Sequence, residues 1–316
     1  MSKNMHIVCP LSGSANLVLR ETIEVKALIK LYSRWGWFDI SSEFLDLETI
    51  NFYHCLDSDL KFFHPLVTGS ESFYQELQKF KWYYMDDKEE YDYACNFITS
   101  EDRVLEVGCG KGAFSQKIKT SNYTGLEFSS KAIEIASHAN INVLNQIVED
   151  YCVSNSDSYD IVCSFQVLEH VSNPKSFIES CLKCLKKGGL LIISVPSDDS
   201  FIGSLKNNIL NMPPHHVTHW SDKALQYVAN CFCLKLIDIH HEKLADIHRR
   251  LYARELVIKS LDNLFKNNQN YSLVDISTNY QVKLKISQVI ASFISAGLTD
   301  DRIKPIGHSV TVVYQK

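Results

Sequence analysis

The stretch that decides the fold is Arg103-Val-Leu-Glu-Val-Gly-Cys-Gly-Lys-Gly-Ala113. It opens with a mostly apolar run at 104–107, as a strand buried on both faces of a sheet requires. Three glycines at alternate positions follow, and glycine lets the backbone adopt positive φ angles and lets a ligand lie against the main chain. Phe114 and Ile118, four residues apart, predict a helix directly after the turn, whose positive end would face that ligand. The stretch therefore predicts a nucleotide-binding strand, turn and helix.

The glycine spacing alone leaves the type of nucleotide open. Gly108, Gly110 and Ala113 also satisfy the relaxed fingerprint of dinucleotide-binding proteins. A second short strand is predicted at 122–126, and it leads into Glu127, nineteen residues after Gly108. A carboxylate in this place can accept hydrogen bonds from both hydroxyls of a ribose.

Four motifs follow one another in the order Glu106-Val-Gly-Cys-Gly-Lys-Gly112, Glu127, Val167-Leu-Glu-His-Val171 and Leu185-Lys-Lys-Gly-Gly189. In this order and spacing they resemble the class I S-adenosylmethionine-dependent methyltransferases. The resemblance covers roughly residues 85–240 and a last strand near 308–315. It implies a Rossmann-like α/β fold, with a mostly parallel seven-stranded sheet and an antiparallel last strand. It also implies S-adenosyl-L-methionine as the cofactor.

The resemblance further implies which residues contact that cofactor. They come from the glycine turn, the ribose acid, the turn after the third strand and the end of the fourth strand. They are Glu106, Gly108, Cys109, Gly110, Glu127, Phe128, Val148, Glu149, Phe165 and Gln166. In the turn after the third strand, the family usually has an acidic residue that contacts the adenine, but this chain has Ile147 at that position. The Val148 amide and Glu149 are therefore the expected adenine contacts.

Three histidines are the catalytic candidates: His170, His215 and His216. Methyl transfer depends mainly on alignment, but a hydroxyl acceptor must also lose a proton, for which histidine is suited. The prolines of Pro213-Pro-His-His216 favour an extended chain, which would direct one of the two imidazoles inward and the other away. Because neighbouring side chains diverge on an extended chain, we expect no metal site here.

The chain divides into four predicted segments. They are an N-terminal extension at 1–84, the cofactor-binding catalytic domain at 85–240, a helical insertion at 241–306 and the last strand of the catalytic sheet at 307–316. The insertion is expected to form a wall of the acceptor site or the surface of a homodimer.

The N-terminal extension contains two patterns that resemble halves of a zinc ribbon, at Cys9-Pro-Leu-Ser12 and Cys55-Leu-Asp-Ser58. Serine is a poor zinc ligand and a structural site needs four good donors. We therefore expect a metal-free relic, although His6, His54 and His64 offer substitute ligands.

Farther along the extension, a helix capped by Ser70 or Ser72 is predicted to pack on the catalytic domain. The functional alternative is a lid, with Tyr74, Tyr83 or Tyr84 closing the cofactor pocket.

The composition of the chain indicates which binding partners and which cell compartment to expect. The 316 residues carry a net charge of −5, which argues against nucleic acid because phosphate binding favours a basic face. Ten cysteines with no apparent signal segment indicate a reducing, cytoplasmic location. No apolar run approaches the ~18 residues that a membrane span needs.

The sequence thus predicts a methyltransferase acting on a small-molecule or glycan acceptor, with the methylated atom (oxygen, nitrogen or carbon) left open. Two alternatives remain: a non-catalytic scaffold that keeps the cofactor fold, and a nicotinamide-dependent oxidoreductase.

Overall fold

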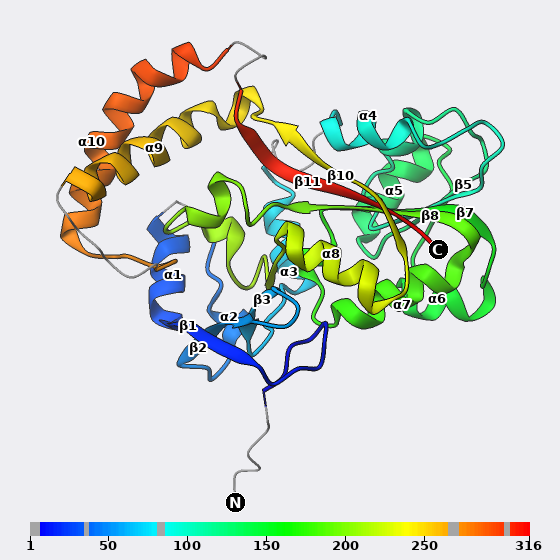
Figure 1. Cartoon of the computed structure of the whole chain (residues 1–316), viewed down its shortest axis with the longest axis horizontal. Coiled ribbons are helices and arrows are strands. Elements are labelled where there is room, and N and C mark those ends of the chain that lie inside the picture. The colour runs from blue at the N-terminus through cyan, green and yellow to red at the C-terminus, as the bar shows by residue number, and fades with distance from the viewer. Residues whose placement is uncertain (1–6, 35–37, 81–85, 265–271, 300–303) are drawn as a thin grey trace, which may run out of the picture.

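The computed structural model describes residues 7–34, 38–80, 86–264, 272–299 and 304–316. Its centre is a seven-stranded sheet in the order β10-β11-β8-β7-β4-β5-β6 (Figure 1). The strands are β10 (Lys235–Lys243), β11 (Ile306–Gln315), β8 (Leu185–Pro196), β7 (Tyr159–Phe165), β4 (Val104–Val107), β5 (Tyr123–Leu126) and β6 (Val143–Leu144). The pairs from β8 to β6 are parallel, and β11 runs antiparallel to both its neighbours. The predicted Rossmann-like sheet with its antiparallel last strand is confirmed.

Helices cover both faces of this sheet because its strands are apolar on both sides. Leu105 and Val162 pack in a core with α6 (Val148–Ser154), α7 (Pro174–Cys184) and α8 (Asp222–Cys231). Their neighbours Val104 and Ile161 face the opposite core, which includes α4 (Glu89–Cys95). Successive residues of a strand point to opposite faces, so this alternation buries the central strands on both faces, while the edge strands β10 and β6 stay partly exposed. Helix α5 (Ser130–His138) follows β5.

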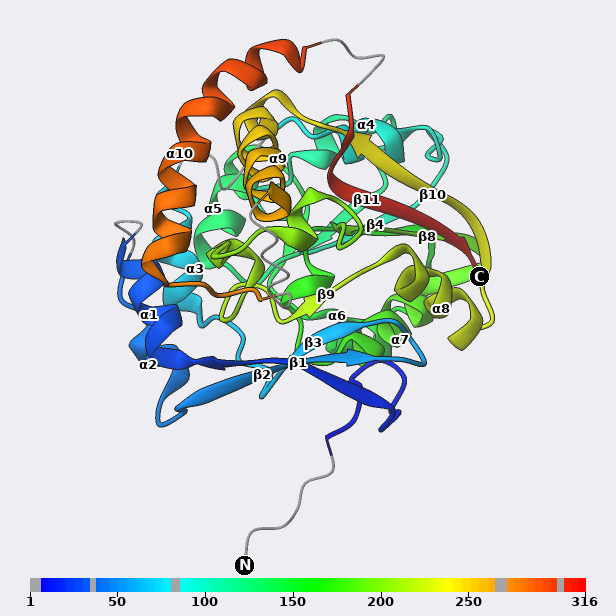
Figure 2. The same ribbon diagram turned by 60° about the vertical axis from the view of Figure 1, so that its left-hand side comes forward.

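A smaller antiparallel sheet, which the sequence did not predict, is formed mainly by the N-terminal extension. Its order is β1-β2-β3-β9, and Figure 2 shows it below the central sheet. The strands are β1 (Leu17–Glu24), β2 (Thr49–Cys55), β3 (Lys61–His64) and β9 (Thr218–His219). Three helices pack with it: α1 (Val25–Arg34), α2 (Ser41–Phe44) and α3 (Glu71–Leu77). Strand β9 comes from the predicted catalytic domain, so the two parts share one sheet.

Ser70 caps α3 as predicted, because its hydroxyl accepts a hydrogen bond from the amide of Phe73. Tyr83, Tyr84 and the predicted boundary at residue 84 lie outside the described residues, as does His6.

The predicted helix directly after the glycine turn is wrong. A three-residue 3-10 turn, Phe114–Gln116, takes its place. The Ser115 hydroxyl donates to the carbonyl of Gly112, 2.7 Å away, and β5 begins a few residues later at Tyr123. The rest of the segment up to β5 consists of turns and bends, so no α-helix dipole acts on the glycine turn.

In the Leu185-Lys-Lys-Gly-Gly189 motif, the glycines after two lysines would suit the end of a helix, but the structure shows otherwise. Helix α7 already ends at Cys184, and Gly188 lies within β8 with φ +82°. The fully buried Leu185 takes an extended conformation and pairs with Tyr159 of β7, so the strand begins before the glycine.

The insertion forms a helical pair, α9 (Arg249–Leu264) and α10 (Thr278–Ile294), at one end of the molecule (Figure 1). Arg250 donates to Ser292 and Lys283 pairs with Asp262, so the helices run antiparallel. Among the helices described, none has the length and apolar character needed to traverse a bilayer.

The four positions of the degenerate zinc pattern converge in space. The Cys9 thiol lies 3.3 Å from the Ser58 hydroxyl, and the Ser12 hydroxyl lies 3.5 Å from the Cys55 thiol. Both cysteines are buried. The fold thus brings the four positions together in two contacting pairs, each of one thiol and one hydroxyl.

We predict that restoring the two thiols restores metal binding at this place. The double variant Ser12→Cys, Ser58→Cys should bind one Co²⁺ with the sulfur-to-cobalt charge-transfer band of thiolate ligation, because a tetrahedral site needs four good donors. The wild-type chain should lack this band, and the single variant Ser12→Cys should bind more weakly. Absence of the band in a folded double variant would show that the four positions cannot enclose an ion.

Candidate functional site

The glycine turn lies at the carboxyl end of β4, held against the neighbouring strand. The amides of Gly108 and Cys109 both donate to the carbonyl of Leu126, at 2.8 and 3.1 Å. Gly108 and Gly110 have φ of +75° and +53°, which other residues adopt only with strain. A Cβ on Gly108 would also come within 2.4 Å of the Val167 side chain. The turn therefore requires glycine for both conformation and space.

Glu127 places a nearly buried carboxylate beside this turn. One oxygen accepts the amide of Gly110 at 2.9 Å, and the other accepts the amides of Phe128 and Ser129, each at 2.9 Å. Phe128 follows β5 and Ile147 follows the adjacent β6, and their side chains are 53% and 50% exposed. Two apolar surfaces thus lie at the same edge of the sheet as the carboxylate.

The other predicted cofactor residues from the glycine turn point into the protein. The buried Glu106 accepts a hydrogen bond from the Tyr123 hydroxyl. Burial raises the pKa of Glu106 to about 8, although that hydrogen bond acts in the opposite direction. Cys109 is buried, and burial raises the pKa of its thiol.

The remaining predicted cofactor residues lie at the ends of β6 and β7. Val148 begins α6 with a buried side chain, and Glu149 next to it is partly exposed. Phe165 is buried at the end of β7. Gln166 has φ +59°, and its side-chain amide donates to the hydroxyls of Ser194 and Ser309.

The three histidines form one cluster with Glu169. Glu169 and His170 lie in a 3-10 turn after β7. The amides of His215 and His216 both donate to the Met212 carbonyl, at 3.0 and 3.2 Å. The predicted extended chain is therefore wrong: the segment forms a tight turn, and both imidazoles point into the cluster. Their rings stack at 4.4 Å with an interplanar angle of 18°.

Burial dominates the electrostatics of this cluster. It lowers the pKa of His170 to about 4 and lowers those of His215 and His216 well below the ordinary value. It raises the pKa of Glu169 to about 8. All three imidazoles are therefore neutral at physiological pH. Tyr74, the one predicted lid tyrosine within the described residues, packs edge-on against His170 with ring centroids 5.8 Å apart.

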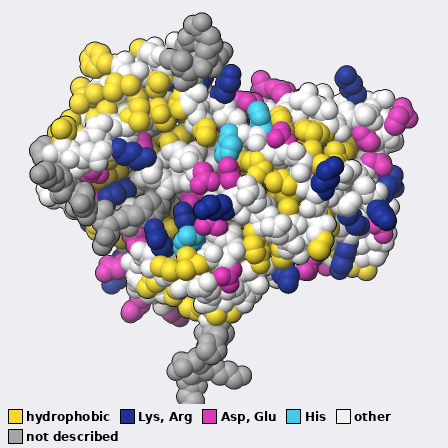
Figure 3. All heavy atoms as spheres, viewed as in Figure 1, with side chains coloured by type: hydrophobic (Ala, Val, Ile, Leu, Met, Phe, Trp, Pro, Cys, Tyr) yellow, Lys and Arg dark blue, Asp and Glu magenta, His cyan; other side chains and the backbone are white. Residues whose placement is uncertain are grey.

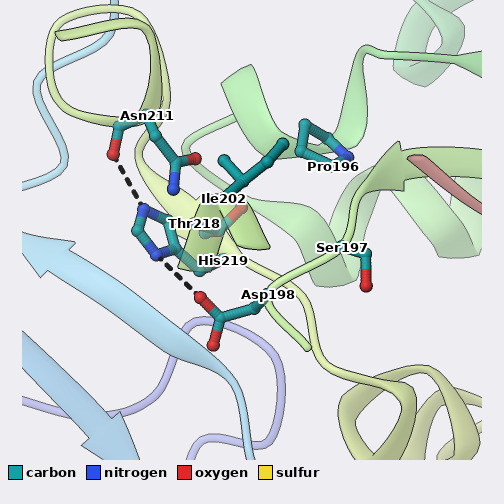
Figure 4. A pocket seen from close by; sticks show the side chains of 7 residues that line it. All are labelled: Pro196, Ser197, Asp198, Ile202, Asn211, Thr218 and His219. Atoms are coloured by element: carbon teal, nitrogen blue, oxygen red, sulfur yellow. Dashed lines mark hydrogen bonds and ion pairs between the residues drawn. The ribbon is translucent and has the colours of Figure 1, made fainter. Parts of the chain in front are cut away.

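A chain of polar contacts, which the sequence did not predict, connects His216 of the cluster to Lys61 of the N-terminal sheet. His216 Nδ1 lies 3.0 Å from Oδ1 of Asn211, and His219 Nε2 donates to the Asn211 carbonyl at 2.9 Å. His219 Nδ1 lies 3.3 Å from Asp198 (Figure 4). Asp198 also pairs with Lys61 of the N-terminal sheet. Burial acts to raise the pKa of Asp198, but the contacts with His219 and Lys61 outweigh it and hold that pKa at about 2.

A cavity of about 90 Å³ adjoins His216 on the side of the helical insertion. Its polar lining comes from Asn208, Asn211, His216, His248 and His308, and four apolar side chains complete it. His308 belongs to β11, and His248 directly precedes α9. The cavity thus lies between the catalytic sheet and the insertion.

The methyltransferase domain family matches residues 74–232, which is half of this chain. The ubiquinone biosynthesis O-methyltransferase of Glaesserella parasuis is 40% identical over 104 residues, covering 29% of this chain and 44% of that protein. The one of Shewanella pealeana is 28% identical over 187 residues, covering 52% and 77%. The chain spans less than half the length of the first of these relatives.

Among solved structures, an S-adenosylmethionine-dependent methyltransferase from Archaeoglobus fulgidus has 16% identity and a TM-score of 0.49, covering 77% of this chain and all of that one. The assignment therefore rests on the family match and on the sheet topology described above. The chain belongs to the methyltransferase domain family, in its Rossmann-like class that uses S-adenosyl-L-methionine as the cofactor.

Proposed function

We propose that the chain transfers a methyl group from S-adenosyl-L-methionine to a hydroxyl oxygen of an uncharged small-molecule acceptor. The cavity beside His216 is the observation that carries this proposal. Among the described residues that line it, the polar groups are imidazoles and amides, and none is Lys, Arg, Asp or Glu. Such a lining can hydrogen-bond hydroxyl groups but supplies no counter-charge for an ionised acceptor. The O-methyltransferase names of the relatives favour oxygen over nitrogen or carbon.

The shape of the glycine turn and the position of the Glu127 carboxylate support the cofactor contacts proposed here. The backbone at Gly108 and Gly110, which carries no side chain, would lie against the amino-acid portion of the cofactor. Glu127 would accept hydrogen bonds from the hydroxyls of its ribose. The exposed side chains of Phe128 and Ile147 would cover the faces of the adenine ring. The Val148 amide and Glu149 would lie beside the adenine. Glu106 and Cys109 would support the turn from below.

Phe165 ends β7, and Gln166 follows it in the segment that leads to the turn carrying Glu169 and His170. When bound, the cofactor supplies the electrophilic methyl carbon. The protein would align the acceptor oxygen with it and keep water out, which can supply much of the rate. His170, His215 or His216 would then contact the acceptor hydroxyl and ease removal of its proton.

A homodimer is part of this proposal. Helix α10 exposes the apolar side chains of Val282, Ile286, Val289, Ile290 and Phe293, and hydrophobic side chains gather over this end of the molecule in Figure 3. This spacing forms one helical stripe. Light scattering should show a dimer that Phe293→Asp dissociates, and a monomeric wild-type chain would refute it.

The acceptor is tested directly by measuring demethylated cofactor with a panel of acceptors. The panel should contain uncharged phenols and sugar alcohols, matched anionic and amine analogues, and short glycans. Turnover is expected with the uncharged hydroxyl compounds. A preference for a charged analogue would contradict the assigned acceptor class, and no turnover with any compound would favour the scaffold alternative.

The role of Glu127 predicts a loss of cofactor affinity on substitution. A charge-assisted pair of hydrogen bonds contributes about 1.5–3 kcal/mol, so Glu127→Ala should weaken binding of S-adenosylhomocysteine by roughly ten- to hundredfold in calorimetry. The exposed Glu134 of α5 provides the matched control, Glu134→Ala. A loss below threefold in a folded Glu127→Ala variant would count against the ribose assignment.

The histidine cluster predicts a separation of turnover from cofactor affinity. His170→Ala should lower kcat by about 10²- to 10⁴-fold, as removal of a proton-transfer group does, while cofactor affinity stays within about twofold. His138→Ala, at an exposed position of α5, should change neither. Strongly weakened cofactor binding in His170→Ala would mean that the cluster serves the cofactor and not the acceptor.

A further inference from the structure

Glu169, beside the three histidines, is a buried side chain whose oxygens lack hydrogen-bond partners among the other described residues. Neither carboxylate oxygen of Glu169 accepts a hydrogen bond from another described residue, and the side chain is only 1% exposed. One ring nitrogen from each of His170, His215 and His216 lies within 4.8 Å of those of the other two. Buried polar atoms without hydrogen-bond partners are costly, and an ion bound among these groups would satisfy them.

The hydrogen bonds on the outer side of the cluster indicate which nitrogen each imidazole presents. His170 Nδ1 lies 2.6 Å from the carbonyl of His215, and His215 Nδ1 lies 2.9 Å from the carbonyl of Leu210. His216 Nδ1 lies 3.0 Å from the side-chain oxygen of Asn211. An oxygen acceptor requires the proton on Nδ1, so in each neutral imidazole the lone pair is on Nε2.

This outer pattern is the one that orients metal-binding histidines. A ligating imidazole almost always donates its second ring N–H to a carbonyl, carboxylate or similar acceptor, which fixes both the tautomer and the ring orientation. Here all three rings are fixed in this way, two by backbone carbonyls and one by Asn211, which is itself hydrogen-bonded to His219.

The distances allow a single ion. The Nε2 atoms of His170 and His216 lie 3.7 and 3.9 Å from the same oxygen of Glu169. Two donors bound at about 2.1 Å to a tetrahedral metal lie about 3.4 Å apart. The contacts with Glu169 would have to shorten by a few tenths of an ångström, and the three imidazole nitrogens, which lie within 4.8 Å of one another, by up to about 1.4 Å to enclose an ion.

We propose that Glu169, His170, His215 and His216 bind one divalent transition-metal cation of the zinc type. Nitrogen from neutral imidazoles and oxygen from one carboxylate suit Zn²⁺ and Co²⁺, whereas Mg²⁺ and Ca²⁺ prefer all-oxygen sites. This site replaces the expectation that the Pro-Pro-His-His segment carries no metal, since that expectation rested on an extended chain. His170 is the partly exposed member and gives the ion a route from solvent.

The proposal goes beyond methyl transfer, because ion binding needs neither cofactor nor acceptor. An imidazole that binds the ion through Nε2 has no nitrogen left for an acceptor, so the part proposed above for His170, His215 or His216 in proton removal belongs to the ion-free chain.

The test is titration of the full-length, chelator-treated chain with Co²⁺, followed by visible absorption. We expect binding to saturate at one equivalent and to give the spectrum of nitrogen and oxygen ligands, without a sulfur-to-cobalt charge-transfer band. Zn²⁺ should displace the cobalt and raise the Tm, because an ion that binds only the folded chain stabilises it. This spectrum of the wild-type chain is informative even if a substituted chain does not fold.

Variants assign the ligands. Removing the hydrogen-bond partner of a metal-binding histidine commonly weakens metal affinity about 10–100-fold. Asn211→Ala should therefore weaken ion binding by this factor. Glu169→Gln and His216→Asn, which change proposed ligands, should weaken it at least as much. His138→Asn and the pair Cys9→Ser, Cys55→Ser should leave it unchanged.

No cobalt binding by the wild-type chain would overturn the site, as would a thiolate band. Affinity unaltered by both Glu169→Gln and His216→Asn would also overturn it. None of these outcomes bears on methyl transfer, which the acceptor panel measures separately.

Discussion

Val217 is the residue through which the two sheets fix the site. Its amide donates to the carbonyl of Glu169 at 2.9 Å, and its carbonyl accepts the amide of Phe63 at 3.0 Å. The residue is fully buried, so both hydrogen bonds are shielded from water and costly to break. One bond ends on the turn after β7 and the other on β3. This residue therefore sets the distance between Glu169-His170 and the preceding pair His215-His216.

The N-terminal extension consequently supports the histidine cluster, the proposed acceptor site. It supplies Lys61, which pairs with Asp198, and the chain of contacts continues through His219 and Asn211 to His216. It also supplies Tyr74 against His170. The acceptor side of the molecule is thus supported by residues far apart in sequence, whereas the turn beside Glu127 is built from one contiguous stretch of the catalytic sheet.

This difference explains what the sequence could predict. The glycine turn, Glu127 and the order of the strands follow from local patterns, because each buried strand and each turn has its own composition. Helix starts depend on local composition in the same way: the side chains of Ser129, Asn173 and Ser221 each accept a hydrogen bond from an amide in the first turn of their helix. Asp198 could not be found, because nothing near it in sequence indicates the pairing with Lys61. The turn at Met212–His216 was mistaken for extended chain, since the proline rule describes local preference and not the tertiary contacts that override it.

The central claim is that the cofactor's reactive end meets an acceptor at the junction of the two sheets. A crystal structure of the full chain with S-adenosylhomocysteine tests this most directly. We predict ribose hydroxyls on Glu127 and a sulfur atom directed toward Glu169, His170 and the cavity beside His216. A ligand bound in the turn with its sulfur directed away from the histidine cluster would contradict the account, as would a ligand bound elsewhere.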